Sequence, residues 1–106
     1  MSLPPSKMVR VILNTDAKNE ADDQYAIVHA LLTPLFDLHC IMPAHFGTRK
    51  SATSLRDSHD EVVKLLDLMN LNGKVRVVDG ATDAMPDERT PAESDGARFI
   101  VEQAMK

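Results

Sequence analysis

The feature that most constrains the fold of this chain is the alternation of short apolar runs with longer amphipathic stretches. Residues 9–13 form a β-branched run that predicts a buried strand, and residues 22–32 predict a helix that follows an acidic loop. Residues 37–42 predict a second strand. Residues 51–71, with apolar side chains at spacings of seven, four and three, predict a long amphipathic helix.

The remaining segments continue this alternation. Residues 75–78 predict a third short strand, and residues from 94 onward predict a last helix. Strands that alternate with helices are typical of parallel strands joined by right-handed crossovers. We therefore expect an α/β fold with an open parallel three-layer sheet, of which this chain forms a β-α-β-α-β-α part. Residues 9–106 are expected to be one domain or the truncated N-terminal part of a larger one, and residues 1–8 a disordered leading or tag segment.

Composition excludes several classes of function. The 106 residues include 12 Lys and Arg and 16 Asp and Glu, so the net charge of −4 leaves no basic excess for binding nucleic acid. No apolar run approaches the length that a membrane span needs. A single cysteine excludes an internal disulfide framework. We therefore expect a cytoplasmic protein that binds neither nucleic acid nor a membrane.

The loop after the first predicted strand has the most informative side chains. Asp16, Glu20, Asp22 and Asp23 fall within eight positions. Carboxylates this close repel one another unless a cation joins them, and a hard divalent cation prefers oxygen ligands. No His or Cys lies in this loop, so a soft metal fits poorly. The alternative is that these acids are solvated charges near a helix start.

The same residues resemble a known family. The run Val11-Ile-Leu-Asn-Thr-Asp16, followed by Asp22-Asp23 opening a helix, is similar to the N-terminal signature of inosine–uridine-type nucleoside hydrolases. That signature is an Asp-x-Asp, a short spacer and an Asp-Asp pair after the first strand. The similarity extends loosely to Ser94-Asp-Gly-Ala, so it covers nearly all of this chain but only the N-terminal part of the family fold.

The resemblance implies a role for each matching residue. Asp16 would bind Ca²⁺ and act as the catalytic base, and Asp23 would be a second Ca²⁺ ligand. Asp22 would contact ribose hydroxyls. Asn14 stands where the family has its first acid, and His45 follows the second strand; we expect both to bind substrate with Asp22. The spacer from Asp16 to Asp22 is two residues longer than is usual in the family.

The implied activity is the Ca²⁺-dependent hydrolysis of the N-glycosidic bond of ribonucleosides in purine and pyrimidine salvage. The partners would be a small ribonucleoside substrate and further copies of the chain, since an unpaired sheet edge favours self-association. As a fragment, the chain is expected to be incomplete or inactive. Two alternatives remain: a small divalent-metal-binding module resembling a response-regulator receiver, with Asp79 after the third strand, or a structural fragment without a site.

Overall fold

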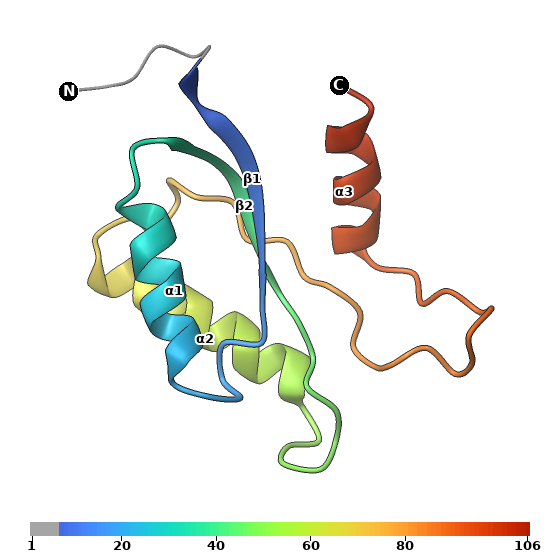
Figure 1. Cartoon of the computed structure of the whole chain (residues 1–106). Helices are drawn as coiled ribbons and strands as arrows, with labels where there is room; N and C mark the ends of the chain where they lie inside the picture. Colours follow the sequence, from blue (N-terminus) through green and yellow to red (C-terminus); the bar gives the residue numbers. More distant parts are fainter. Residues whose placement is uncertain (1–6) are drawn as a thin grey trace.

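The structure is a computed structural model, which describes residues 7–106. Most of the predicted leading segment, residues 1–8, therefore lies outside the described residues. The described chain contains two strands and three helices (Figure 1). In chain order they are β1 (Val9–Thr15), α1 (Asp22–Leu31), β2 (Phe36–Pro43), α2 (Ser54–Leu68) and α3 (Asp95–Ala104). None of the helices described is long and apolar enough to cross a membrane.

The two strands form a parallel sheet, as the alternating pattern predicts. Val9 pairs with Phe36 and Thr15 pairs with Pro43, with one irregularity in register after Val11. Each strand is longer than the apolar run that predicted it, because the ladder continues into polar residues at the carboxyl end of β1. The α/β class is therefore confirmed. The larger three-layer sheet is not formed by the described residues, whose sheet has two strands.

The prediction of a third strand at residues 75–78 was wrong in its extent. The structure has a single parallel bridge there, between Ile41 and Val77. The amide of Ile41 donates to the carbonyl of Arg76 at 2.9 Å, and the amide of Val78 donates to the carbonyl of Ile41 at 3.1 Å. The amide of Gly80 also donates to the carbonyl of Pro43 at 3.0 Å, so this segment runs beside β2 as far as Gly80 although only Val77 forms a bridge.

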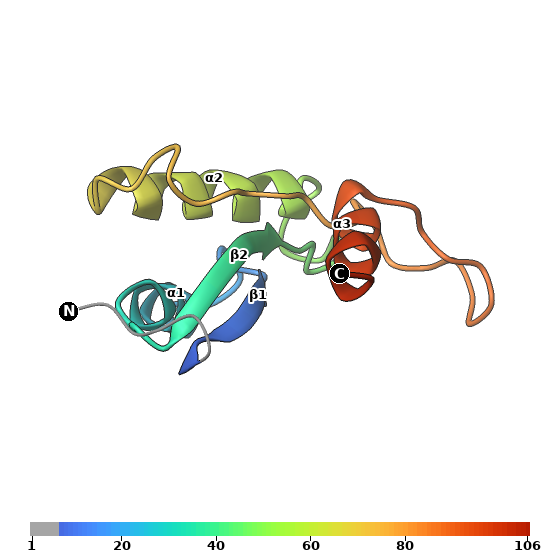
Figure 2. The same cartoon turned by 90° about the horizontal axis from the view of Figure 1, so that it is seen from above.

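The helices pack against both faces of the two strands, and Figure 2 shows α3 on the opposite side from α1. One buried cluster lies between the sheet and the two helices α1 and α2. Its members are Ala17, Ile27, Ile41, Val62 and Leu66. A second cluster places Phe99 of α3 against Cys40 and Met42 of β2. Adjacent residues of β2 thus face opposite clusters, as the two-residue period of a strand requires.

The helix ends differ from the sequence expectation by a few residues. Asp22 does not cap α1; it is the first helical residue, after Ala21. Its charge still lies near the positive end of the helix dipole. The second helix is shorter than residues 51–71, because Asn70 adopts a left-handed conformation with φ of 57°. A helix cannot continue through such a residue.

The position of α3 depends on a close approach at its start. The amide of Gly96 donates to the carbonyl of Asp79 at 2.8 Å. A Cβ atom at Gly96 would lie 2.9 Å from that carbonyl oxygen and 2.6 Å from Sδ of Met42. Only glycine fits here without displacing the chain. The segment that follows the Ile41–Val77 bridge therefore anchors α3 against the sheet.

Candidate functional site

The predicted site residues lie where β1 ends and α1 begins. Thr15 is the last residue of β1 and is buried, and Asp16 follows it, partly exposed. Asp23 lies in the first turn of α1. The hydroxyl of Thr15 donates to Oδ2 of Asp23 at 2.7 Å, which ties the helix start to the strand end. The structure thus brings the two predicted Ca²⁺ ligands, Asp16 and Asp23, to the same place.

Each of these two carboxylates has one oxygen held by a neutral donor. Oδ2 of Asp16 accepts a 3.1 Å hydrogen bond from Nδ2 of Asn19, and Oδ2 of Asp23 accepts the bond from Thr15. The amide of Asn19 also donates to the carbonyl of Asp16 at 2.8 Å. Among the described residues, no side-chain donor bonds Oδ1 of either carboxylate. Each carboxylate thus keeps an oxygen that no neutral side-chain donor engages, and the two carboxylates interact with each other.

The pKa of Asp16 reflects both its burial and the nearby Asp23. Burial raises the pKa of Asp16 above its ordinary value, and the neighbouring Asp23 raises it further as a hydrogen-bond partner and as a like charge. The hydrogen bond from Asn19 opposes this by lowering the pKa of Asp16. A shared proton or a bound cation would relieve the repulsion between the two carboxylates.

The donor set fits part of a hard-cation site. Ca²⁺ takes about six to eight oxygen ligands. Within residues 7–106, no group of three or more His, Cys, Asp and Glu side chains is placed to hold a metal ion. Asp16 and Asp23 would therefore supply two carboxylates, and water, main-chain carbonyls or substrate hydroxyls would have to supply the rest. Soft metals are disfavoured because both side chains are oxygen donors.

Of the other predicted residues, Asn14 and Asp22 lie close by in the chain and His45 follows β2, but none of them is bonded to these acids. Asn14 and Asp22 are exposed, and His45 is partly buried in the loop after β2. Nδ1 of His45 accepts a 3.2 Å bond from the amide of Gly47. In the described part of the chain, no side-chain hydrogen bond joins Asn14, Asp22 or His45 to either carboxylate. Their predicted role in binding substrate stays a prediction.

Sequence reasoning missed the polar side chains that hold this loop. Nζ of Lys50 donates to Oδ1 of Asn19 at 3.0 Å, so the loop after β2 reaches the loop after β1. Lys18 lies 3.5 Å from Glu61 of α2. An Asp followed three residues later by Asn in a loop is a local signal for the Asp16–Asn19 bond. No local signal points to Lys50, which is 31 positions away.

Glu61 joins three segments around this loop. It accepts a 3.2 Å hydrogen bond from Nε2 of Gln24 in α1, besides its contact with Lys18. The bond from Gln24, together with the charge of Lys18, lowers the pKa of Glu61 despite its partial burial. The ionised carboxylate of Glu61 therefore holds the β1–α1 loop and the start of α1 against α2.

A second polar arrangement joins α2 to the segment after residue 78. Nδ1 of His59 lies 2.6 Å from Oδ1 of Asp79. The ring of His59 is only one-third exposed. The pairing arises because the Ile41–Val77 bridge carries Asp79 past the side of α2. The bond between His59 and Asp79 thus links α2 to the segment after residue 78, which is distant from it in sequence.

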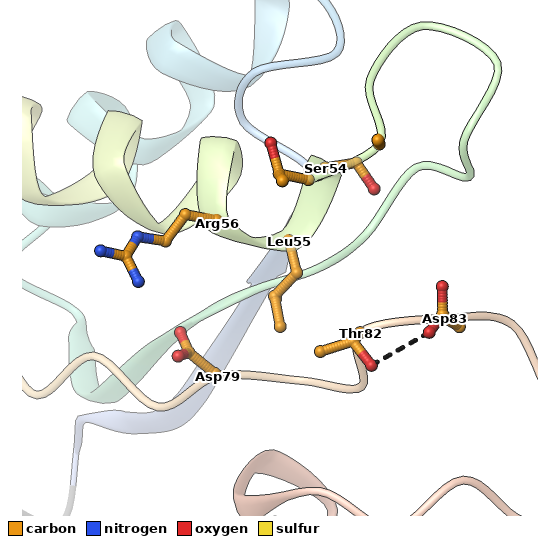
Figure 3. Close-up of a pocket in the computed structure, with 8 residues that line it drawn as sticks. Ser54, Leu55, Arg56, Asp79, Thr82 and Asp83 are labelled. Carbon is orange, nitrogen blue, oxygen red and sulfur yellow. Dashed lines mark hydrogen bonds between the residues drawn. The ribbon is translucent and has the colours of Figure 1, made fainter.

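Asp79 also borders a cavity of about 380 Å³ at the start of α2. Figure 3 shows Leu55 facing Thr82, whose hydroxyl donates to Oδ2 of Asp83 at 3.2 Å. Arg56 extends away from these residues, and its Nε lies 3.8 Å from Asp60. None of the residues predicted for the nucleoside-hydrolase-like site lines this cavity. The predicted site and this cavity are therefore separate features.

Comparisons with known proteins found no relative. No protein-family model, no curated protein and no solved structure matches the chain. The similarity to nucleoside hydrolases therefore depends on the motif residues from Asn14 to Asp23, and it stays a prediction. What supports a function is the arrangement of those residues at the end of β1.

Proposed function

We propose that this chain carries part of a nucleoside-hydrolase-like site, which binds Ca²⁺ and the ribose of a ribonucleoside. The observation that carries the proposal is the interaction of Asp16 with Asp23 at the carboxyl end of β1. In open parallel sheets, ligands bind beyond the carboxyl ends of the strands. The larger fold proposed with it is the open three-layer parallel sheet of that family, of which β1 and β2 would be two strands.

The chemistry proposed for Asp16 is that of a general base. A bound Ca²⁺ would lower the pKa of a coordinated water. Oδ1 of Asp16, which no described side-chain donor engages, would accept a proton from the attacking water. The activated water would then form a bond to C1′ as the C1′–N bond breaks through an oxocarbenium-like state, and the departing base would take its proton from solvent.

The residues proposed to bind substrate are Asp22, Asn14 and His45. Asp22 and Asn14 are exposed near the two acids, so their side chains are accessible to ribose hydroxyls. His45 is placed near the end of β1 because the amide of Ala44 donates to the carbonyl of Thr15 at 2.8 Å. Two carboxylates supply only part of a Ca²⁺ shell, so the proposed activity of this chain alone is low.

Calorimetric titration of the whole chain with Ca²⁺ tests the proposal. We expect Asp16→Ala to weaken Ca²⁺ binding at least tenfold, about 1.4 kcal/mol. The matched control is Asp22→Ala, which removes an equal charge at the preceding helical position, about 100° around the axis of α1 from Asp23, and should cost less. Equal losses in both variants, or none in Asp16→Ala, would contradict the assignment of Asp16.

Activity provides a second measurement. Ribose release from inosine and uridine should depend on Ca²⁺ and fall in Asp16→Ala more than in Asp22→Ala. An Asp16→Ala variant with undiminished hydrolysis would contradict the proposed base. Labelling of Asp79 by acetyl phosphate would instead favour the receiver-like alternative, and a melting temperature unaffected by Ca²⁺ would favour a structural fragment without a site.

A further inference from the structure

Strand β1 lies at an open edge of the sheet. The far side of β2 is bridged by Val77, whereas the described residues place no strand beside the free side of β1 (Figure 2). This strand is seven residues long and contains neither proline nor lysine, two residues that commonly protect such an edge. Its one charged side chain, Arg10, donates to the carbonyl of Gln103 in α3 at 2.8 Å. An edge of this kind is suited to pair with another strand.

The backbone of β1 presents hydrogen-bonding groups at this edge. The amide of Val9 and the carbonyl of Thr15 each make a 2.8 Å hydrogen bond on the side of β2. Backbone groups of successive residues in a strand point to opposite edges, and these two residues are an even number of positions apart. The amides and carbonyls of Arg10, Ile12 and Asn14 therefore face the open edge.

The chain also exposes more surface than a compact monomer of its mass. Its accessible surface is 7433 Å², and a monomeric protein of 11.7 kDa typically exposes about 5,900 Å². The excess, about 1,500 Å², is larger than the area of roughly 800 Å² that each partner buries in a standard interface. Apolar side chains near the open edge contribute to it: Val9 is 49% exposed, and Ile100 of α3 is 44% exposed. Ile100 and Ile12 line a groove of about 280 Å³ between α3 and the sheet.

We propose that β1 pairs with β1 of a second copy of this chain, antiparallel and about a two-fold axis at Ile12. A two-fold axis perpendicular to the sheet makes two identical edge strands antiparallel and closes the assembly at two copies. Ile12 then lies opposite its own counterpart, and Arg10 lies opposite Asn14 of the second copy. This register pairs all three residues whose backbone groups face the edge. A register centred on Arg10 would instead place two like charges opposite each other, which is unfavourable.

Sedimentation velocity of the whole chain tests the dimer and its register. We expect the mass to rise from 11.7 kDa to twice that value as the concentration increases, without larger species. Because Arg10 meets Asn14 twice in the dimer, Asn14→Asp should tighten association about two- to thirtyfold, and Asn14→Lys should weaken it by a similar factor. By net charge alone the signs would be reversed, since the chain already carries a net charge of −4.

Asn72 gives the matched control, because it is exposed in the turn after α2 and lies outside β1. Asn72→Asp and Asn72→Lys make the same changes in net charge, so they should show only the smaller, reversed effect. The proposal is overturned if the chain stays monomeric at every concentration, if it forms an open series of larger assemblies, or if the Asn14 variants behave as the Asn72 variants do.

Amide hydrogen exchange, measured by NMR, identifies the edge that pairs. Protection of the amides of Arg10, Ile12 and Asn14 should rise with protein concentration, because they face the second copy. Protection of Val11, whose amide faces β2, should be high at every concentration. A dimer in which the first three amides exchange at a constant rate would place the interface elsewhere and overturn the pairing. Neither measurement requires Ca²⁺, so the outcome is independent of the proposed function.

Discussion

The hydroxyl of Thr15 donates a 2.7 Å hydrogen bond to the carboxylate of Asp23, across the loop that joins β1 to α1. Thr15 is buried at the end of the strand, and Asp23 lies in the first turn of the helix. The bond sets where the helix starts relative to the strand, and so it brings Asp23 to Asp16.

Replacing this hydroxyl with a methyl group should destabilise the fold. Thr15→Val preserves the side-chain shape but removes a hydrogen bond to a charged group, which is worth about 1.5–3 kcal/mol. We expect a loss at the lower end of this range, because Asp23 is partly exposed. Urea unfolding measures it. Thr33→Val is the control, since the Thr33 hydroxyl donates to the carbonyl of His29 at the surface, and its loss should cost less.

The repulsion between Asp16 and Asp23 predicts a pH-dependent stability. Burial and the nearby Asp23 raise the pKa of Asp16 in the folded chain above its ordinary value of 3.8. The folded state then binds the proton more tightly than the unfolded state, so stability falls as the pH rises above 3.8 and Asp16 ionises. At neutral pH, ionised Asp16 therefore opposes folding.

The isosteric variant Asp16→Asn tests this sign. At pH 7 without Ca²⁺, we expect it to melt about 2–4 °C higher than the parent chain, for a gain of about 0.5 kcal/mol. The difference should disappear at pH values well below 3.8, where both side chains are neutral. A variant that melts lower than the parent chain at pH 7 would refute the repulsion.

The close approach at Gly96 predicts that a single methyl group displaces α3. Gly96→Ala would place a Cβ 2.9 Å from the carbonyl oxygen of Asp79, so the backbone must shift. Overpacking of this kind typically costs about 1–3 kcal/mol. Urea unfolding should show that loss in Gly96→Ala, while Ala97→Ser, at an exposed position of the same helix, should stay within about 0.5 kcal/mol. Equal stability of both variants would exclude the steric explanation.

The buried stripe of α2 should dominate stability. Leu66 is 1% exposed and packs in the cluster with Ile27 and Val62, whereas Leu68 is 74% exposed. Leu66→Ala should lower the free energy of unfolding by about 2–5 kcal/mol. The same substitution at Leu68 should change it by about 0.5 kcal/mol or less. Similar losses at both positions would mean that α2 packs with a different face.

Several features of the fold could be predicted because their causes are local. The β-branched run at residues 9–13 predicted β1, and the apolar spacing of residues 51–71 predicted most of α2. Ser94 preceded the last helix as expected, and its hydroxyl accepts a 3.0 Å bond from the amide of Ala97. Each signal lies within a few residues of the element that it predicts, so neighbouring side chains suffice to produce it.

The candidate site was only partly predictable. The motif placed Asp16 and Asp23 in one loop, and the structure brings them together. It indicated neither the bond from Asn19 to Asp16 nor the pairing of His59 with Asp79. The extent of the third strand was also misjudged, because a run of four residues with three valines does not reveal how much of it will pair with another strand.

The sequence by itself determined the order of strands and helices, the parallel pairing and the acidic loop behind β1, because periodicity, chain order and charge act along the chain. Only the tertiary structure decided that Lys50 reaches Asn19 and that His59 meets Asp79, because these contacts join segments 31 and 20 positions apart. Such contacts form only where packing of α2 and the bridge at Val77 bring distant loops together. No local pattern contains that information.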